Sequence, residues 1–369
     1  MNARLVAALL APALFAVAPA ATAQNGTQVR PCQGDPSALC VYGQADFTAE
    51  GREIRILAEA EDDDVKVRGD ENDIGIEDGF GGELDVIGDE NTIDGSDRSD
   101  RIATAGCRNT VKARAFRDFV NAEDRGGCTG PVVVIRAGRG VDKVEIDSDE
   151  PAIVRGERDP DHIDGGGGDD RLYGGVGGHV QSIIEGRAGD DRIRGGPKGE
   201  FLIRGGRGDD RIKGGKGSDT IFGNHGHDTL HGNTGYDGVY GNRGRDRVFG
   251  GKGDDREVSG GNGDDLVDGG RGDEGFIRLF AGIFGGPGQD VLKGGGGDDR
   301  LTGQKGDDIV RGNTGDDKLD GKRGRDRLLG GKGSDRLRGG KHNDILNGGR
   351  GQDHRCKGDR GRDVARRCG

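Results

Sequence analysis

The sequence predicts an all-β solenoid, a stack of short parallel strands, and three observations lead to this prediction. Glycine accounts for 79 of 369 residues, about three times its ordinary usage. Many of these glycines recur every nine residues, and an aliphatic residue recurs at the same interval. Hydrophobic residues make up only 30% of the chain and aromatic residues 4%, too few for a large globular core. A stack of short coils needs only a narrow ladder of apolar side chains, so a chain with few hydrophobic residues can still fold as a solenoid.

The first 23 residues have the pattern of a secretory signal peptide. Arg4 precedes an apolar run over residues 5–18, and the small residues Ala21, Thr22 and Ala23 follow. This run is too short to span a bilayer as a helix. We therefore expect cleavage near Ala23 and Gln24, and a mature protein that is secreted, extracellular and has no transmembrane anchor.

Residues 24–136 are predicted to form an N-terminal β-rich segment. Asn72, Asn91 and Asn109 stand in similar sequence surroundings and are spaced 19 and 18 residues apart, which is the length of one coil with two strands. This spacing favours metal-free coils that continue the solenoid, with disulfides at its ends. A small independent β domain is the alternative.

The charges of the chain are unevenly distributed. The whole chain has 67 acidic and 55 basic residues and a net charge of -12. Residues 24–160 hold 31 of the acidic and 17 of the basic residues, whereas residues 161–369 hold 36 and 37 and are nearly neutral. The negative balance argues against a nucleic acid partner, because phosphate binding requires a basic surface.

From Gly205 onward the chain is built from nonapeptides of the form G-G-x-G-x-D-x-U-x, where U is aliphatic, and a second uninterrupted block begins at Gly285. We number the positions of each repeat 1 to 9. Glycine at positions 1, 2 and 4 is expected to permit positive φ and close backbone approach in a turn. Positions 7 to 9 are expected to form a short strand with position 8 pointing inward, so that two repeats make one 18-residue coil. The predicted core residues at position 8 are Leu172, Ile193, Ile212, Ile221, Leu230, Val239, Val248, Val267, Leu292, Leu301, Val310, Leu319, Leu328, Leu337 and Leu346.

The aspartates at position 6 are the candidate metal ligands. Stacked coils place these carboxylates in file about 4.8 Å apart, where they repel one another unless a cation lies between them. Carboxylate and carbonyl oxygens without His or Cys favour Ca²⁺ over zinc or a redox metal. The predicted ligands are Asp170, Asp191, Asp210, Asp219, Asp228, Asp237, Asp246, Asp255, Asp265, Asp290, Asp299, Asp308, Asp317, Asp326, Asp335, Asp344 and Asp353.

These nonapeptides resemble the hemolysin-type calcium-binding (RTX) repeat. The resemblance covers about residues 137–363 and implies a right-handed parallel β-roll or β-helix solenoid. It also implies multiple bound Ca²⁺ ions, held by positions 1 to 6, and folding that depends on calcium. Residues 364–369, which include Cys368, are expected to form a C-terminal cap.

Some copies depart from the repeat. The nonapeptide frame assigns position 6 to His179, Phe201 and Glu274, and we expect no calcium at residues 179 and 201. Residues 276–284 are more apolar than their neighbours and are expected to form a bulge or a loop outside the solenoid.

The chain has six cysteines: Cys32, Cys40, Cys107, Cys128, Cys356 and Cys368. An even number in an exported chain indicates disulfides. The simplest pattern joins neighbours in the sequence, 32 with 40, 107 with 128 and 356 with 368, but the sequence does not choose among the possible pairings.

The function predicted is calcium binding with a structural or surface-interaction role and without catalysis, since HExxH and GxSxG motifs are absent. One alternative is a secreted enzyme or toxin with an active site in residues 24–136. Another is a calcium-dependent adhesin that contacts cell-surface or extracellular polymers. His225, His227 and His231 also suggest a zinc site, but they occupy variable positions of the repeat, and a surface location is favoured. The Arg-Gly-Asp sequences at 68–70, 207–209 and 271–273 are interpreted as coincidental.

Overall fold

The computed structural model describes residues 28–33, 35–42, 45–57, 64–76, 82–123, 128, 131, 133–176, 181–198, 201–273, 282–351 and 355–368. The expected signal peptide and the predicted ligand Asp353 lie outside these residues, and so do His179 and Glu274. No helix in this part of the chain is long and apolar enough to cross a membrane.

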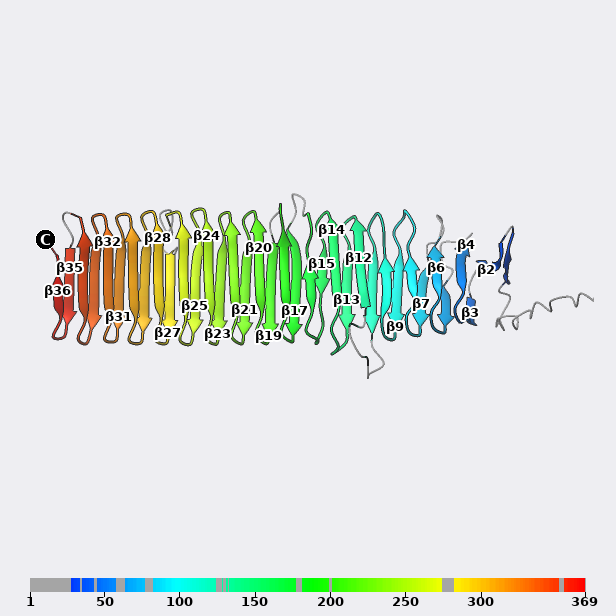
Figure 1. Ribbon diagram of the computed structural model, residues 1–369, viewed down its shortest axis with the longest axis horizontal. Helices are drawn as coiled ribbons and strands as arrows, with labels where there is room; N and C mark the ends of the chain where they lie inside the picture. The colour runs from blue at the N-terminus through cyan, green and yellow to red at the C-terminus, as the bar shows by residue number, and fades with distance from the viewer. Residues whose placement is uncertain are drawn as a thin grey trace, which may run out of the picture.

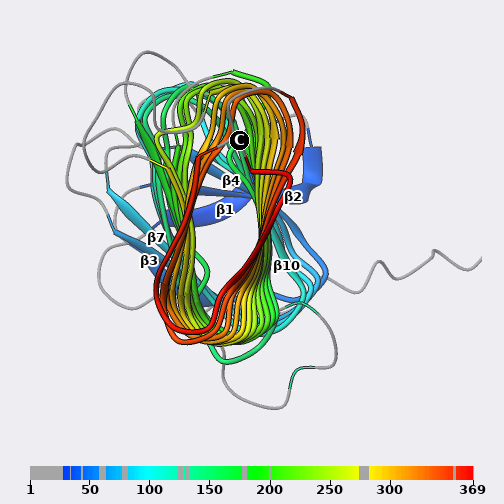
Figure 2. The ribbon, with the colours of Figure 1, turned by 90° about the vertical axis from the view of Figure 1, so that its left-hand side faces the viewer.

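The described chain is all-β and forms one elongated stack of strands (Figure 1). From β3 (Ala45–Thr48) onward, odd-numbered strands pair with odd-numbered strands and even-numbered strands with even-numbered ones, always in parallel. Two consecutive strands therefore make one coil, with one strand in each of two sheets. Along the stack the coils superpose as a flattened tube (Figure 2). The predicted all-β solenoid is confirmed.

The strands of the first part of the chain are β1 Gln28–Cys32, β2 Asp35–Tyr42, β3 Ala45–Thr48, β4 Glu53–Leu57, β5 Val65–Arg68, β6 Asp73–Ile76, β7 Glu83–Ile87, β8 Thr92–Asp94, β9 Arg101–Ala105, β10 Asn109–Lys112, β11 Phe119–Glu123, β12 Val133–Arg139, β13 Lys143–Asp147, β14 Ile153–Arg158, β15 His162–Asp164, β16 Arg171–Tyr173, β17 Ser182–Ala188 and β18 Arg192–Gly196. The strands of the second part are β19 Phe201–Arg207, β20 Arg211–Lys216, β21 Thr220–His225, β22 Thr229–Thr234, β23 Gly238–Arg243, β24 Arg247–Lys252, β25 Glu257–Asn262, β26 Leu266–Arg271, β27 Gly282–Pro287, β28 Val291–Gly296, β29 Arg300–Lys305, β30 Ile309–Thr314, β31 Lys318–Arg323, β32 Arg327–Lys332, β33 Arg336–Lys341, β34 Ile345–Arg350, β35 Arg355–Arg360 and β36 Val364–Arg366.

Most strands of the nonapeptide region are longer than the predicted three residues. Most span six residues, namely positions 7 to 9 and positions 1 to 3 of the next repeat, as in β22. Burial alternates along them, with positions 8 and 1 inside. The strand continues past position 9 because the next inward residue is a glycine, which fits between the two sheets.

The predicted ladder of position 8 residues forms the core. All fifteen are at most 2% exposed, and their register aligns them from coil to coil, as for Ile212, Leu230 and Val248. One coil carries an extra residue after Asp255, so that Val258 takes the inward place in that coil. Because each position 8 side chain packs on the equivalent side chains of adjacent coils, the apolar core is narrow and extends along the axis of the stack.

The coils of the front segment have a wider apolar interior. β4 and β6 each bury two isoleucines, Ile54 with Ile56 and Ile74 with Ile76. The second inward residue of later coils in this sheet is small, as at Ala113 and Ala137, and is glycine from Gly156 onward. Strand pairing runs through this transition, from β4 and β6 through β8, β10, β12 and β14 to β16.

Two further details of the sequence prediction are wrong. Residues 282–284 of the expected loop belong to β27, and Ile283 is fully buried in the core ladder; the rest of that loop lies outside the described residues. The register also aligns Ser182, and not His179, with Asp161 and Phe201 on the line of position 6 residues. The sequence frame failed here because an insertion displaces the repeat between β16 and β17.

Three disulfides join Cys32 to Cys40, Cys107 to Cys128 and Cys356 to Cys368, so the simplest pairing is the one found. The first lies in the antiparallel hairpin of β1 and β2, which adds to the first coil strands. The last holds β35, where Cys356 aligns with Leu337 in the core ladder. Both ends of the stack are thus cross-linked where the ladder loses its next coil.

Candidate cation-binding turns

Position 6 aspartates form two columns of buried carboxylates along the solenoid. The first column consists of Asp170, Asp191, Asp210, Asp228, Asp246, Asp265, Asp290, Asp308, Asp326 and Asp344, and the second of Asp219, Asp237, Asp255, Asp299, Asp317 and Asp335. Each of these residues is at most 3% exposed. The sixteen described residues among the predicted ligands are therefore placed in the turns where the repeat pattern puts them.

One carboxylate oxygen of these residues has a structural role. The backbone N–H of Asp210 donates to Oδ1 of Asp228 at 2.9 Å, and that of Asp228 donates to Oδ1 of Asp246 at 2.8 Å. The same bond recurs between the successive first-column aspartates from Asp170 to Asp344. Each position 6 side chain thus satisfies a turn N–H of the preceding coil.

The second carboxylate oxygen is buried and has no hydrogen-bond partner in most of these turns. This holds for Oδ2 of Asp170, Asp191, Asp210, Asp228, Asp237, Asp246, Asp255, Asp265, Asp290, Asp308, Asp317, Asp326 and Asp344. A buried carboxylate oxygen without a donor is costly, so a group of this kind requires a proton or a cation.

The unpartnered oxygen lies over the glycine at position 1 of its own repeat. A Cβ added to Gly223 would be 2.1 Å from Oδ2 of Asp228 and 2.8 Å from the carbonyl oxygen of Gly241 in the next coil. A carboxylate oxygen and a backbone carbonyl oxygen therefore face the same small space. Glycine leaves this space open, since a Cβ at Gly223 would collide with Oδ2 of Asp228 in this geometry.

In the nonapeptide turns, positive φ occurs at positions 2 and 4, whereas the sequence predicted it at position 1 as well. Gly206 and Gly208 have φ of 128° and 126°, but Gly205 does not adopt positive φ. Position 2 also accepts asparagine, as at Asn224 (φ 81°) and Asn233 (φ 80°). Asparagine tolerates the left-handed conformation better than most residues, which explains why it alternates with glycine at this position only.

Burial raises the pKa of Asp210 to about 8, of Asp228 to about 7 and of Asp246 to about 6, against an ordinary value of 3.8. Loss of hydration is the main cause, and nearby carboxylates add to it. The backbone N–H bonds to Oδ1 act in the opposite direction. The turns therefore hold their carboxylates in an environment that disfavours an uncompensated negative charge.

The oxygen donors of these turns fit calcium. Among the described residues, no group of three or more His, Cys, Asp and Glu side chains could hold a metal ion by side chains alone. A bound cation would draw the rest of its ligands from backbone carbonyls, such as that of Gly241. Mixed carboxylate and carbonyl ligation is typical of Ca²⁺.

Position 5 side chains form a second, exposed ladder that runs in the opposite direction. Oδ1 of Asp209 accepts the backbone N–H of His227 at 2.7 Å, and Oδ1 of Asp316 accepts that of Ser334 at 2.7 Å. Neighbouring coils on both sides thus supply acceptors to each turn. Asp209 and Asp273 of the Arg-Gly-Asp sequences belong to this ladder.

The second column is interrupted at Ser182 and Phe201. Phe201 is fully buried, and its ring occupies the space over Gly174, Gly195 and Gly196. Its backbone N–H donates to Oδ1 of Asp219 at 3.0 Å, so the stacking of coils continues. An aromatic ring thus fills this turn where other turns have a carboxylate.

The front segment has asparagine on the line of the first column. Oδ1 of Asn91 accepts the backbone N–H of Asn72 at 2.9 Å, and Nδ2 of Asn109 donates to the carbonyl oxygen of Gly88 at 2.9 Å. The amide of Asn109 thus donates a hydrogen bond where an aspartate would leave an oxygen without a donor. In these turns the residues with positive φ are at positions 3 and 5, as for Gly88 and Glu90.

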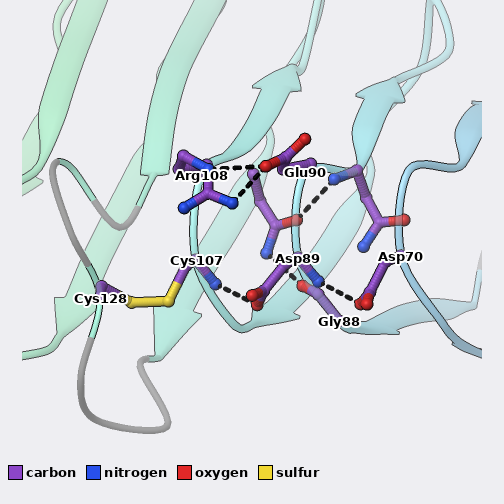
Figure 3. A network of polar contacts seen from close by, with 9 residues as sticks. Asp70, Gly88, Asp89, Glu90, Cys107, Arg108 and Cys128 are labelled. Atoms are coloured by element: carbon purple, nitrogen blue, oxygen red, sulfur yellow. Dashed lines mark hydrogen bonds and ion pairs between the residues drawn. A yellow bond between two sulfur atoms is a disulfide. The ribbon is translucent and has the colours of Figure 1, made fainter.

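Figure 3 shows the outer side of these asparagine turns. The backbone N–H of Asp89 donates to Oδ1 of Asp70 at 2.7 Å, and Oδ1 of Asp89 accepts the N–H of Cys107 at 2.8 Å. Arg108 forms an ion pair with Glu90. Protein groups thus hold the outer side of these turns together, whereas Nδ2 of Asn91 is buried without a hydrogen-bond partner.

The three clustered histidines have separate partners. Nε2 of His225 lies 3.2 Å from Nη1 of Arg243, and Nδ1 of His227 accepts the backbone N–H of Arg245 at 2.8 Å. The ring of His231 stacks on Phe249 with centroids 4.5 Å apart. Their geometry does not support the zinc hypothesis.

Comparison with known families agrees with this geometry. A family model described as the RTX calcium-binding nonapeptide repeat (4 copies) matches residues 153–178, 182–197, 204–239, 226–257, 240–273, 284–319 and 320–354. No curated protein matches the chain.

The raised pKa values predict how the metal-free fold responds to pH. The folded chain retains protons on the position 6 carboxylates that the unfolded chain releases above about pH 4. Metal-free stability should therefore be greatest near pH 4 and fall as pH rises through 6 to 8, by about 1.4 kcal/mol for each unit by which the pKa of one aspartate is raised. Thermal unfolding in calcium-free buffers tests this. A midpoint that rises with pH over this range would contradict it.

The substitution Asp228→Asn tests the role of the unpartnered oxygen. The amide keeps the Oδ1 acceptor and removes the buried charge, so the metal-free chain should gain about 1 to 4 kcal/mol in its free energy of unfolding at pH 7.5. The calcium-loaded chain should lose part of its stabilisation by calcium. Denaturant unfolding with and without calcium measures both effects. Asp209→Asn, at an exposed position 5, is the matched control, and equal behaviour of the two variants would refute this role.

Proposed function

On the premise that this chain is an RTX calcium-binding nonapeptide repeat protein, we propose that it is secreted and that Ca²⁺ completes its fold outside the cell. We further propose that its role is structural or surface-interacting and does not involve catalysis. The residues that carry the proposal are the position 6 aspartates of the two columns.

The observation that supports the proposal best is the set of buried, unpartnered Oδ2 atoms. Each half-coil buries only one aliphatic side chain at position 8, so the apolar core is thin. Desolvated carboxylates in file are unfavourable in such a structure. Divalent cations between them would convert this repulsion into attraction between neighbouring coils.

The chain's own groups have distinct roles in this scheme. Position 6 Oδ1 atoms keep the turns in register through backbone N–H bonds. Position 6 Oδ2 atoms and the carbonyl oxygens of position 1 glycines would hold the cation. Calcium, when bound, supplies positive charge and cross-links adjacent coils through oxygen coordination. Because the binding groups come together only in the stacked state, binding free energy becomes folding free energy.

Export is supported by two features of the sequence. The N-terminal pattern is typical of a signal peptide, and three disulfides are typical of oxidising compartments.

Basic residues crowd positions 3, 7 and 9 and make residues 161–369 nearly neutral before any metal binds. This weakens the attraction for calcium, so we expect dissociation constants of about 10⁻⁴ to 10⁻³ M, as in extracellular modules.

A binding role toward acidic polymers is favoured by one surface. A hollow of about 400 Å³ on β31, β33 and β35 is lined by basic residues, with two acidic residues among them. The basic residues are Lys322, Arg323, Arg338, Lys341 and Arg360. Carboxylate or sulfate groups of an extracellular polysaccharide would complement this charge.

Circular dichroism tests the folding role. Addition of millimolar calcium to the metal-free chain at pH 7.5 should increase β-sheet content, and EDTA should reverse the change. Magnesium should be less effective, because it demands a tighter octahedral arrangement. A spectrum that is already β-rich without metal and is unchanged by calcium would refute calcium-coupled folding. Hydrolytic activity assigned to residues 24–136 would refute the non-catalytic part.

Retention on an acidic polysaccharide matrix tests the surface role. The double variant Arg323→Gln and Lys341→Gln should elute at lower salt than the wild type, with affinity reduced several-fold, since two positive charges of the hollow are lost. Arg207→Gln and Lys216→Gln, which remove the same charge elsewhere on the solenoid, are the control. Equal elution of the two double variants would exclude the hollow as the binding surface.

A further inference from the structure

We propose a separate set of cation sites in the junction between the asparagine coils and the nonapeptide coils, formed by Asp118, Asp142 and Asp161. These sites lie between the turns 113–118, 137–142 and 156–161. The proposal rests on the proposed function, because it uses the same carboxylate and carbonyl chemistry. It departs from the sequence-based expectation that residues 24–136 are metal-free, and two of its three aspartates precede the nonapeptide matches.

The three carboxylates are buried and stacked like those of the repeats. Their residues are 2%, 2% and 3% exposed. The backbone N–H of Asp118 donates to Oδ1 of Asp142 at 2.8 Å, and that of Asp142 donates to Oδ1 of Asp161 at 3.0 Å. Oδ2 of all three residues is buried without a hydrogen-bond partner. Three successive coils thus present the same unpartnered oxygen that marks the nonapeptide turns.

The backbone of these turns has the nonapeptide conformation. Positive φ occurs at positions 2 and 4, at Arg114 (78°) and Phe116 (79°) in the first turn and at Glu157 (72°) and Asp159 (72°) in the third. The left-handed conformation costs a residue with a side chain about 1 kcal/mol or more. The asparagine turns instead have it at positions 3 and 5. The cation-type turn is therefore retained even where glycine is absent.

The turn of Asp161 also keeps the space found in the repeats. A Cβ added to Gly156 would be 2.2 Å from Oδ2 of Asp161 and 2.7 Å from the carbonyl oxygen of Gly174. The other two turns have Ala113 and Ala137 at position 1, both fully buried. Carboxylate and carbonyl oxygens thus converge at Asp161 as they do at Asp228.

The set is preceded by a turn that protein groups complete and followed by two turns that have no aspartate at position 6. Before it, Oδ2 of Asp100 accepts the backbone N–H of Ser96 at 2.7 Å, and Oδ1 accepts its hydroxyl at 2.9 Å. After it, Ser182 and Phe201 continue the column. The three aspartates are therefore separate from the second column that starts at Asp219, and they would bind cations independently of it.

These sites lie where the interior of the tube changes from paired aliphatic side chains to glycine. Ile146 is still an inward aliphatic residue, whereas Gly165 takes the equivalent place in the next coil of the same sheet. A cation here would strengthen the contact between coils that fold on apolar packing and coils that depend on calcium. The acidic charge of residues 24–160 favours cation binding at this point.

The test combines hydrogen exchange and calcium stoichiometry on the full mature chain. In the wild type, peptides within residues 113–147 should gain protection when calcium is added. In the double variant Asp118→Asn and Asp142→Asn, this calcium-dependent gain should disappear, and equilibrium dialysis with radioactive calcium should show at least one ion fewer per chain. The control is Asp70→Asn with Asp89→Asn, which removes two charges from the asparagine turns and should leave both readouts unchanged.

Two outcomes separate this inference from the function on which it rests. If peptides of residues 205–273 respond to calcium but those of 113–147 do not, and the double variant binds as many ions as the wild type, the junction sites are refuted and the calcium function stands. If neither region responds to calcium, the proposed function itself is refuted.

Discussion

The structure depends on one constraint, the burial of an aspartate in most of the described nonapeptide turns, with one carboxylate oxygen bonded to a backbone N–H and the other without a hydrogen-bond partner. This arrangement explains why position 1 is glycine in the turns of both columns, since a Cβ there would collide with Oδ2 in their geometry. It explains why the core can be one aliphatic residue wide, because contacts between coils do not have to come from apolar area alone. It also explains the basic residues on the outer positions, which compensate the acidic columns within the same coils.

The front coils solve the same stacking problem without that constraint. They bury two aliphatic residues in a strand, as Ile54 and Ile56 do, and replace the carboxylate by the amide of asparagine. An amide carries both an acceptor and donors, so it can bond to backbone groups of the preceding coil without leaving a charge behind. The same coil geometry is thus held in two ways. The front coils use apolar packing and an amide ladder, whereas the nonapeptide coils use buried carboxylates and a cation.

The sequence predicted the solenoid, the aliphatic ladder and the placement of the position 6 aspartates, because strict periodicity fixes which side chains share a face. It did not predict the strand length, since pairing over positions 1 to 3 depends on how the neighbouring coil packs. It also missed Asp118, because Arg114 and Phe116 replace the glycines that mark such a turn. Their positive φ values are set by the adjacent coils and leave no local signature in the sequence. The misplacement of His179 has a similar origin, since an insertion shifts the frame without disturbing the register of Ile163, Ile184 and Ile203.

From β3 onward, odd-numbered strands lie in one sheet and even-numbered strands in the other. The number of strands inserted or removed, odd or even, therefore decides which sheet each later strand joins. Removing or duplicating 18 residues within a regular block would preserve which sheet each later strand joins, so the solenoid could change length with its end disulfides and columns intact. A change of nine residues would move every later strand to the opposite sheet and exchange the two columns. Length variation in such a protein should therefore proceed in pairs of repeats, even though the sequence repeats singly.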